Sequence, residues 1–517
     1  MKLKIQNSIN LIFFFCFVMN AQNIADFTSV NPLVQTEQFV IPSSHAFQKI
    51  IEVDDALSEG GLMERNPDFT GFIPILNSST NGYLSINSEK VPGTAAIFDI
   101  NFNATTKLWE QTLSQAIDFT SVGGTIANCS GTVTPWNTVI SCEEYSIHSD
   151  FNNDGYSDFG WNVEIDPVTK TVIGKLWAMG NMKHENVTIH SNHRTAYQGA
   201  DSNPGYLYKF VANTAQDLNS GLLYVYKGLK NGAGDWILLD NTTQNERNTT
   251  LLSQSVSINA TEFNGIEDVE IGPDGMVYFA VKGSPDERVY RFQDSDPLTG
   301  TTLSMETFVG GMNYDIIHDS VTTSVPWGAG NDNLAFDNQG NLWVFQDGDN
   351  HYMWVIETGY TQVIPKVMIF GIAPIGSEPT GITFTPDFNY LFMSIQHPDI
   401  NNNANQTDVE GNVLDFDKGT SLVIALNVNL SQVLSINPII KETYKSITYP
   451  NPNNKNSELT IKRIQINSID IYNAIGQRVF YSNYSKQPEV NLDLQFLNSG
   501  VYTIWINSNE IIKLLIE

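Results

Sequence analysis

Acidic residues lie close to several predicted strands and suggest metal chemistry. Five segments place carboxylates in or beside a loop that leads into a strand: ISCEEY with Glu143 and Glu144, KHENVTI with Glu185, GIEDVEI with Glu267, GNDNLAF with Asp332 and SEPTGITF with Glu378. Carboxylates that a fold brings together repel one another, and bound metal ions relieve that repulsion. A fold that gathers these segments would therefore make them candidate metal ligands.

Two cysteines, Cys129 and Cys142, lie within NCSGTVTPWNTVISCEEY. In an exported protein, two cysteines at this separation usually form a disulfide. A thiolate beside hard carboxylates is instead a suitable ligand for iron. On composition alone both readings stay open.

The segment DFNNDGYSD resembles a calcium-binding loop. Asp150, Asn152, Asp154 and Asp158 stand at alternate positions, and Gly155 allows the sharp turn. The twelfth position is Trp161, so the bidentate glutamate of an EF-hand is absent. A peripheral calcium site and an ordinary polar loop both fit this pattern.

The elements around these residues predict an all-β fold. Three stretches, which begin at Ile271, Phe336 and Phe384, share an apolar pair, a turn at Pro-Asp or Asp-Asn and a return as an outer strand. Weaker copies begin at Trp161 and Arg194. Repeats of this size with irregular insertions indicate a β-propeller, although turn spacing alone also fits a sandwich. In a propeller the five acidic segments would converge on one face of the central channel.

The N-terminus predicts export. Lys2 and Lys4 precede an apolar run from Ile9 to Met19, and the small residue Ala21 follows, which is typical of a secretory signal peptide over residues 1–21. The run is too short for a transmembrane helix, and no later segment is long and apolar enough to be one. We therefore expect a secreted or cell-surface protein without a transmembrane segment, from which Cys16 leaves with the signal peptide.

The chain is strongly acidic, with a formal net charge of −29. Loss of the signal peptide, which has two lysines and no acid, would make it −31. Such a field repels nucleic acid, so we expect no nucleic-acid partner, and it also repels phosphorylated molecules unless cations reverse it locally.

The last 74 residues differ in composition. Residues 444–517 contain seven basic and six acidic side chains, so a domain boundary is expected after an acidic domain of residues 22–443. The segments YPNPNNKNSELTI, SIDIYNAIGQRVF and LNSGVYTIWINSNEIIKLLIE predict about six strands in a small β-sandwich. This tail resembles the C-terminal sorting domain of the type IX secretion system of Bacteroidetes, and the resemblance implies that machinery as a partner.

The larger domain resembles the PhoX-type alkaline phosphatases. The resemblance rests on six ordered motifs across roughly residues 60–430: NCSGTVTPWNTVISCEEY, MGNMKHE, AYQGADSNPGYLYKF, GIEDVEIGPDGMVYFA, DNLAFDNQGNLW and EPTGITFTPDFNYLFMSIQHP. It implies a six-bladed β-propeller that binds ferric iron and calcium in an oxo-bridged cluster and hydrolyses phosphate monoesters of small molecules. It implies Cys129 as an iron ligand, and Glu143 or Glu144, Glu185, Glu267 and Asp332 as metal ligands, with Glu378 a weaker candidate. No side chain is assigned as a nucleophile, and Cys142 is then a buried strand residue.

Two departures from the family pattern concern arginines that would hold phosphate. The family usually has arginine where this chain has Gly265, and often where it has Asn181. Lys183 or Arg194 could compensate as substrate-binding residues. The departures keep two alternatives open: a non-catalytic metal-binding propeller at the cell surface, and a calcium-dependent lactonase or phytase-like hydrolase.

Overall fold

The structure, a computed structural model, describes residues 23–430, 446–454, 456–507 and 510–517. It divides into two compact units, Met1–Val433 and Leu434–Glu517. The predicted signal peptide, residues 1–21, and the predicted boundary after residue 443 lie outside the described residues.

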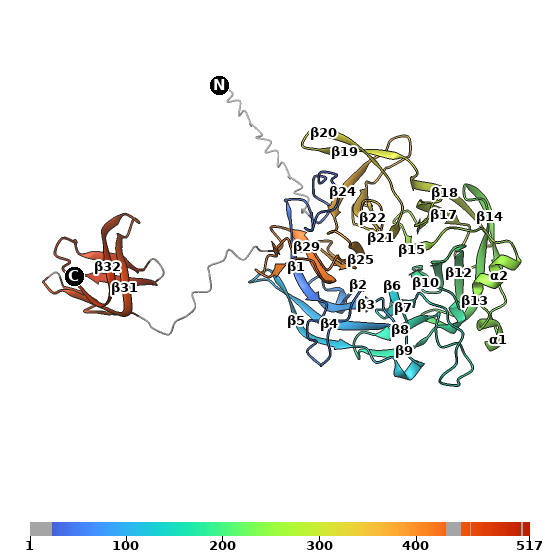
Figure 1. Cartoon of the computed structure of the whole chain (residues 1–517), viewed down its shortest axis with the longest axis horizontal. Coiled ribbons are helices and arrows are strands. Elements are labelled where there is room, and N and C mark those ends of the chain that lie inside the picture. The colour runs from blue at the N-terminus through green and yellow to red at the C-terminus, as the bar shows by residue number, and fades with distance from the viewer. Residues whose placement is uncertain (1–22, 431–445, 455, 508–509) are drawn as a thin grey trace, which may run out of the picture. The chain divides into compact units, whose positions relative to one another are not determined.

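The larger unit is a six-bladed β-propeller, as predicted (Figure 1). Each blade is an antiparallel sheet whose first strand lies nearest the central channel. The first blade consists of β2(Pro67–Pro74), β3(Asn81–Ser88), β4(Thr94–Asn103) and β5(Leu108–Ala116), the second of β6(Asn128–Val133), β7(Val139–Glu143), β8(Asn162–Asp166) and β9(Thr171–Lys175). The third consists of β10(His184–Ile189), β11(Thr195–Ala200), β12(Leu207–Thr214) and β13(Asp217–Gly228), the fourth of β15(Ile266–Ile271), β16(Val277–Val281), β17(Arg288–Asp294) and β18(Thr302–Gly310). The fifth consists of β21(Asn331–Phe336), β22(Leu342–Gln346), β23(Tyr352–Ile356) and β24(Val367–Ile372), the sixth of β25(Glu378–Phe384), β26(Tyr390–Gln396), β29(Thr420–Leu426) and β1(His45–Glu52).

Strand β1 closes the ring. It is the outermost strand of the last blade, where it pairs with β29 from His45 opposite Leu426 to Glu52 opposite Thr420. The N-terminal strand and the C-terminal strands of the propeller therefore share one sheet, which closes the ring. The third and fourth blades are also joined, because β14(Gly232–Leu238) pairs with both β13 and β18.

The predicted turns at Asp274, Asp337 and Asp387 join the first strand of a blade to the second. In each turn the aspartate side chain accepts a backbone N–H two residues further on, at 2.9 to 3.2 Å. This local bond explains why the same turn residues recur. The return strand is the second of the four rather than an outer one.

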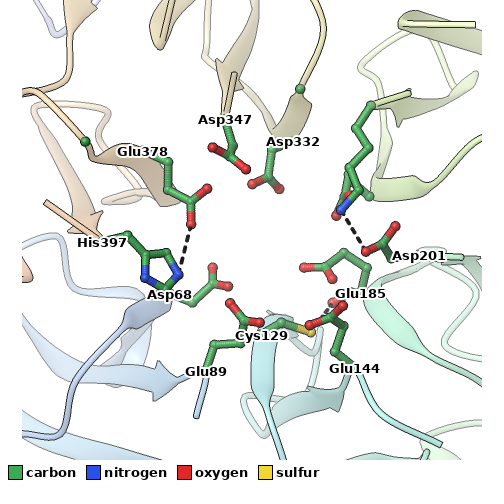
Figure 2. Close-up of a pocket in the computed structure, with 14 residues that line it drawn as sticks. Asp68, Glu89, Cys129, Glu144, Glu185, Asp201, Asp332, Asp347, Glu378 and His397 are labelled. Atoms are coloured by element: carbon green, nitrogen blue, oxygen red, sulfur yellow. Dashed lines mark hydrogen bonds and ion pairs between the residues drawn. The ribbon is translucent and has the colours of Figure 1, made fainter. Parts of the chain in front are cut away.

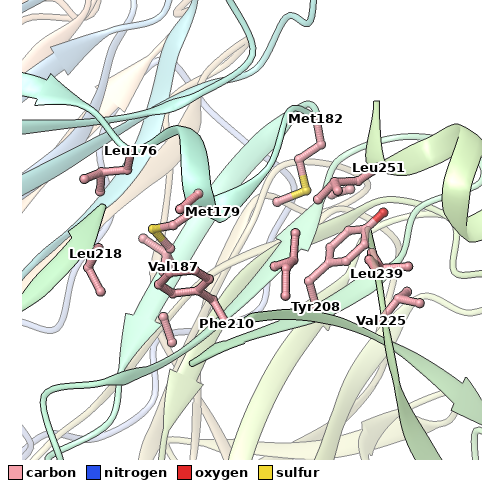
Figure 3. Packing of buried hydrophobic residues seen from close by; sticks show 14 of the residues in the cluster. Leu176, Met179, Met182, Val187, Tyr208, Phe210, Leu218, Val225, Leu239 and Leu251 are labelled. Atoms are coloured by element: carbon pink, nitrogen blue, oxygen red, sulfur yellow. The ribbon is translucent and has the colours of Figure 1, made fainter. Parts of the chain in front are cut away.

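Six apolar cores lie between successive blades and hold the ring together. Figure 3 shows the core between the second and third blades, where Met179, Val187 and Phe210 are fully buried. Blades that are covered on both faces bury whole strands, so all seven residues of β26 are buried, five of them apolar. Each fully buried Leu, Phe, Met or Ile side chain of this strand contributes about 1.5 to 3 kcal/mol.

Elements outside the blades are short. They include the hairpin of β19(Asn313–His318) and β20(Val321–Pro326), the pair of β27(Gln406–Thr407) and β28(Val413–Leu414), and the helices α1(Gln244–Arg247) and α2(Leu251–Ser257). Helix α1 begins with a capping box between Thr243 and Glu246.

The second unit is a small β-domain. Its five strands are β30(Ile447–Tyr449), β31(Leu459–Asn473), β32(Arg478–Leu492), β33(Gly500–Ile506) and β34(Glu510–Ile516), against about six predicted. The order is β30-β31-β33-β34, with β32 also paired to β31. It has an apolar core of its own, formed by residues such as Ile469, Leu494 and Ile504.

Candidate metal centre

The first strand of every blade contributes one acidic or thiol side chain to a cavity in the centre of the propeller. This inner ring consists of Asp68 of β2, Cys129 of β6, Glu185 of β10, Glu267 of β15, Asp332 of β21 and Glu378 of β25. The first five are each the second residue of their strand, at a point where the pairing register shifts. A bulge leaves residues out of the ladder and re-aims their side chains.

An outer ring comes from the residue that directly follows the second strand of each blade. Its members are Glu89, Glu144, Asp201, Lys282, Asp347 and His397. The two rings are in register, because the residues before them are partners in the sheet: Asn331 pairs with Gln346, so Asp332 and Asp347 are neighbours. Figure 2 shows the two carboxylates side by side.

The cavity between the rings has a volume of about 250 Å³. Twelve of its lining residues belong to the rings, and the other two are Gly330 and Gly376. Nine of the twelve are carboxylates, and among the lining residues only Lys282 carries a permanent positive charge. Buried water alone would not offset the free-energy cost of ionising so many buried carboxyl groups.

Burial and mutual repulsion disfavour ionisation of these acids. They raise the pKa of Asp68 to about 7, and burial together with the adjacent Glu89 raises the pKa of Glu144 to about 8. The pKa values of Glu185, Asp332 and Glu378 are raised further, first by burial and then by neighbouring carboxylates. Cations between the rings would reverse these shifts, because they favour the ionised form.

Three inner-ring carboxylates lie close enough to share one ion. Oxygens of Glu185, Glu267 and Asp332 all lie within 4.8 Å of one another. They come from three successive blades, so an ion at this point would link three sheets. Their oxygen donors suit a hard cation.

Cys129 adds a sulfur donor at the edge of this group. Its buried thiol lies 3.1 Å from the carbonyl oxygen of His184 and 3.8 Å from that of Glu185. Burial and the charge of Glu185 raise the pKa of this thiol well above its usual range. A bound metal would be needed to hold it as a thiolate.

Cys142 takes no part in the cavity. Both cysteines are free thiols, and Cys142 Sγ donates instead to Asn162 Oδ1 at 3.1 Å. Thiol–carboxylate sites of this kind fit iron and calcium together, since sulfur suits the first and oxygen suits both. The residues present therefore fit the metal ions that the sequence predicts.

Of the predicted pair Glu143 and Glu144, only Glu144 reaches the cavity, because successive strand residues face opposite sides. Glu143 is fully buried elsewhere and its oxygens are already occupied. They accept from Thr125 Oγ1 and from the backbone of Gly160 and Trp161, and Oε1 lies 3.0 Å from Lys175 Nζ. This residue acts as a structural partner within its blade.

The two predicted substrate-binding residues lie away from the cavity lining. Arg194 stands at the turn between β10 and β11, at the opposite end of β10 from Glu185, and its Nε donates to the carbonyl of Ala212. Lys183 lies over the ring of Tyr145 and lines an adjacent cavity of about 200 Å³. Its charge does lower the pKa of Glu144, so it lies near the rim.

Lys282, rather than Lys183 or Arg194, is the basic residue that lines the central cavity. Its Nζ lies 2.7 Å from Asp201 and 2.5 Å from Glu267. It also crosses Gly265, where an added Cβ would be 2.9 Å from Lys282 Cγ and 2.8 Å from Asp201 Oδ1. The missing side chain at Gly265 thus leaves the space through which Lys282 reaches the carboxylates.

Sequence reasoning missed six lining residues, all outside the five acidic segments: Asp68, Glu89, Asp201, Lys282, Asp347 and His397. Five of them belong to the outer ring. The sequence does mark four of them, because a charged or polar residue directly follows a run of strand residues in GADS, VKGS, QDGD and IQHP. These residues are Asp201, Lys282, Asp347 and His397.

Residues 104–399, more than half of the chain, match the family described as alkaline phosphatase PhoX. Residues 447–517 match the secretion system C-terminal sorting domain. These two matches mark a secreted or cell-surface protein. A comparison with curated proteins finds no match. In the described part of the chain, no helix has the length and apolar character to cross a membrane.

Among solved structures the propeller is similar to that of Pseudomonas fluorescens PhoX, which was solved with vanadate as a transition state analogue. The TM-score is 0.61 at 20% identity, and the likeness covers 78% of this chain and 98% of that one. A Trichoderma reesei carbohydrate-active enzyme of family AA12 is far less similar, with a TM-score of 0.32 at 11% identity over 63% of this chain and 99% of that one. The first likeness establishes the fold, and the match over residues 104–399 establishes the family: the chain belongs to the PhoX alkaline phosphatases, a family of metal-dependent hydrolases.

Proposed function

We propose that this protein is a secreted phosphatase that hydrolyses phosphate monoesters of small molecules, with ferric iron and calcium as its metal ions. The observation that supports this most is the central cavity, where six blades supply nine carboxylates and one thiol. An apolar ligand finds no suitable surface there. A cluster of cations and a phosphoryl group together would balance the charge.

The inner ring would hold the metals. Cys129, Glu185 and Glu267 would bind iron, and Asp332, Glu378 and Asp68 would complete the sites for calcium. When bound, these cations supply the positive charge that phosphoryl oxygens need and the Lewis acidity that activates water. The side chains themselves fix where that charge lies, because each is attached to a different blade.

Lys282 would bind a phosphoryl oxygen directly. Its ammonium group is oriented by Asp201 and Glu267, its side chain is 43% exposed, and it lines the cavity. A charge-assisted hydrogen bond from a fixed ammonium replaces, with less geometric selectivity, the guanidinium fork expected at Gly265.

The test combines metal analysis with an activity assay on the purified chain. We expect both iron and calcium in the protein, and hydrolysis of p-nitrophenyl phosphate that is lost after chelation and restored by calcium with iron. Metal without hydrolysis of any monoester would favour the non-catalytic metal-binding propeller. Calcium without iron, together with hydrolysis of lactones or phytate, would favour the calcium-dependent hydrolase.

A matched pair of cysteine variants tests the site itself. Cys129→Ala should abolish iron binding and lower activity by at least about a hundredfold, because it removes the sulfur donor. Cys142→Ala removes an equally buried thiol outside the cavity and should keep iron and activity. Equal iron loss in the two variants would contradict the assignment of Cys129 as a ligand.

A further inference from the structure

A second cavity lies between the third blade and helix α2. It has a volume of about 200 Å³. Met182, Ala200, Tyr208 and Leu252 supply its apolar surface, so it is lined by the segment before β10, the end of β11, β12 and α2. A cavity of about 150 Å³ is already large enough to bind benzene. This second cavity therefore has room for an aromatic ring or a short alkyl chain.

The polar side chains that line the second cavity already have partners within the protein. The hydroxyl groups of Ser146, Ser202 and Thr250 each donate a hydrogen bond to a neighbouring protein oxygen. Among the lining residues, Lys183 alone is charged. A strongly polar occupant would find few free hydrogen-bond partners in this cavity, so the lining favours an apolar occupant.

One residue separates the second cavity from the central one. Asp201 of the outer ring lines the central cavity (Figure 2), and its neighbours on both sides, Ala200 and Ser202, line the second cavity. The backbone N–H of Asp201 donates to the carbonyl of Lys183 at 3.2 Å, which holds this wall against the segment before β10. On its central side, Asp201 Oδ2 lies 2.7 Å from Lys282 Nζ. A molecule held by Lys282 is therefore one residue away from the second cavity.

Helix α2 forms the outer wall of the second cavity. Leu251 is fully buried in the core that Figure 3 shows, and Ser255 is hydrogen-bonded to the hydroxyl of Tyr208 at 3.0 Å, so both residues fix the helix against the third blade. Leu252 lines the cavity and is 39% exposed. An element outside the blades thus places one apolar side chain between the cavity and solvent. Such segments on a rigid scaffold commonly decide what a protein binds.

We propose that the second cavity binds the organic part of the phosphate monoester and so favours substrates whose leaving group is an aryl or alkyl alcohol. This binding mode rests on the proposed phosphatase function, and it adds the class of ester that the site takes. The central cavity would hold the phosphoryl group, because that part of the substrate carries the charge that cations and Lys282 recognise. The apolar part would then exchange contact with water for contact with Met182 and Leu252.

Hydrolysis itself requires a place for the leaving group outside the metal cluster. The reaction breaks the bond between phosphorus and the ester oxygen, and water provides the oxygen that joins the phosphate. The ester oxygen takes up a proton from that water and departs as the alcohol. The attacking and leaving oxygens lie roughly in line during phosphoryl transfer, so the leaving group points away from the attacking water. A cavity beside the phosphoryl site can hold that group while it departs.

The test compares two esters on the full purified chain with its iron and calcium. Benzyl phosphate and glycerol 1-phosphate both release a primary alcohol, so they differ mainly in the polarity of the leaving group. We expect kcat/KM to be at least about tenfold higher for benzyl phosphate, because a few apolar contacts change selectivity by that factor. Leu252→Ser should reduce this preference about tenfold, with unchanged iron and calcium counts. Leu252→Gln, which keeps a good helix former, provides a second variant should the first fail to fold.

The matched control is Val256→Ser. Val256 lies one helical turn after Leu252 in α2, is 51% exposed and lines neither cavity. This variant should keep the wild-type preference. Benzyl alcohol alone should bind chelator-treated wild-type protein in ligand-observed NMR, and the signal should weaken in the Leu252 variants but not in Val256→Ser.

The outcomes separate the role of the second cavity from the phosphatase function itself. If the wild-type protein with its metals hydrolyses neither ester, the phosphatase function is wrong, and so is the assignment of the second cavity. If both esters are hydrolysed and the folded Leu252 variants keep the wild-type preference, the assignment of the second cavity alone is overturned. Binding of benzyl alcohol without any preference for benzyl phosphate would also overturn it, because the cavity would then serve a separate ligand.

Discussion

At the scale of single residues, Lys282 is where this chain departs most from the pattern expected of its family. It stands opposite Gly265 in the sheet region that follows β16, and its N–H donates to the carbonyl of Gly265 at 3.1 Å. Lys282 thus places a positive charge beside Gly265, where the family resemblance implies an arginine. The positive charge is kept at the cavity while its attachment to the fold changes.

Substitution of Lys282 should affect substrate binding more than metal content. Lys282→Ala removes one charge-assisted hydrogen bond, worth about 1.5 to 3 kcal/mol, so kcat/KM should fall about ten- to a hundredfold. Steady-state kinetics with iron and calcium counts on the same samples would check this. Lys183→Ala should have a small effect; a larger loss there than at Lys282 would support the sequence-based assignment of Lys183 instead.

At the scale of elements, the inner strands show how far sequence reasoning reaches. Glu185, Glu267, Asp332 and Glu378 were identified because each opens a strand with a visible apolar pattern. The outer ring was missed because its members have no local pattern of their own. Asp347, for example, becomes a neighbour of Asp332 only through the register of β21 and β22, which is a long-range property.

Glu143 shows a second limit of the same kind. Glu143 and Glu144 lie next to each other in a segment predicted to supply a metal ligand, and only Glu144 lines the cavity. Strand alternation decides between the two, but the phase of that alternation depends on where the bulge of β6 falls. Turn chemistry and apolar periodicity are local, so the sequence indicates repeated β-hairpins, which also fit a sandwich; the count of six blades follows from the family resemblance.

The Glu143–Lys175 pair is an element-scale support for the second blade. Both side chains are almost fully buried, at 0% and 2% exposure. Lys175→Met should lower the free energy of unfolding by about 3 to 5 kcal/mol, because it leaves a buried charge unpaired. Urea unfolding would measure this, and the double variant with Glu143→Gln should recover much of the loss.

An exposed ion pair provides the control. Lys418 lies 3.0 Å from Asp54, with 41% and 63% of the two side chains exposed. Lys418→Met should change stability by at most about 1 kcal/mol. Equal losses at Lys175 and Lys418 would mean that the buried pair has no special role.

The turn into β21 brings Asp332 of the inner ring and Asp347 of the outer ring together beside one glycine. Gly330 has a φ of +82°, and an added Cβ would lie 1.7 Å from the carbonyl oxygen of Asp347. Gly330→Ala should therefore displace Asp347 and lower metal content as well as stability. Gly275 has a φ of +78° with open space around it, so Gly275→Ala should cost only about 1 kcal/mol and keep the metals. Metal analysis of both variants, with equal content in the two, would contradict this.

At the scale of the whole molecule, the centre joins all six blades. Each blade supplies one residue to each ring, so charge in the cavity acts on every sheet at once. The apolar cores between blades favour the closed ring, whereas repulsion between nine central carboxylates opposes it. Metal ions would convert that repulsion into attraction across the ring.

This balance predicts that stability falls as pH rises in the metal-free protein and changes little in the metal-loaded protein. Without metal, the pKa values of Asp68, about 7, and Glu144, about 8, lie above their unfolded values, so the folded chain binds protons that the unfolded chain has released. The free energy of unfolding should then fall between pH 6.5 and 8.5, by up to about 1.4 kcal/mol per pH unit for each proton. His45 and His184 do not contribute in this window, because burial lowers their pKa values to about 4.

Urea unfolding at pH 6.5, 7.5 and 8.5 would separate the two states. Chelator-treated protein should lose stability across the series, and protein loaded with iron and calcium should stay nearly constant, because its ligands are already ionised. Addition of metal to the chelated protein at pH 7.5 should also release protons, which a weakly buffered indicator assay can count. Parallel pH slopes with and without metal, or a metal-free protein that gains stability toward pH 8.5, would show that the central carboxylates are not the sites where the cations bind.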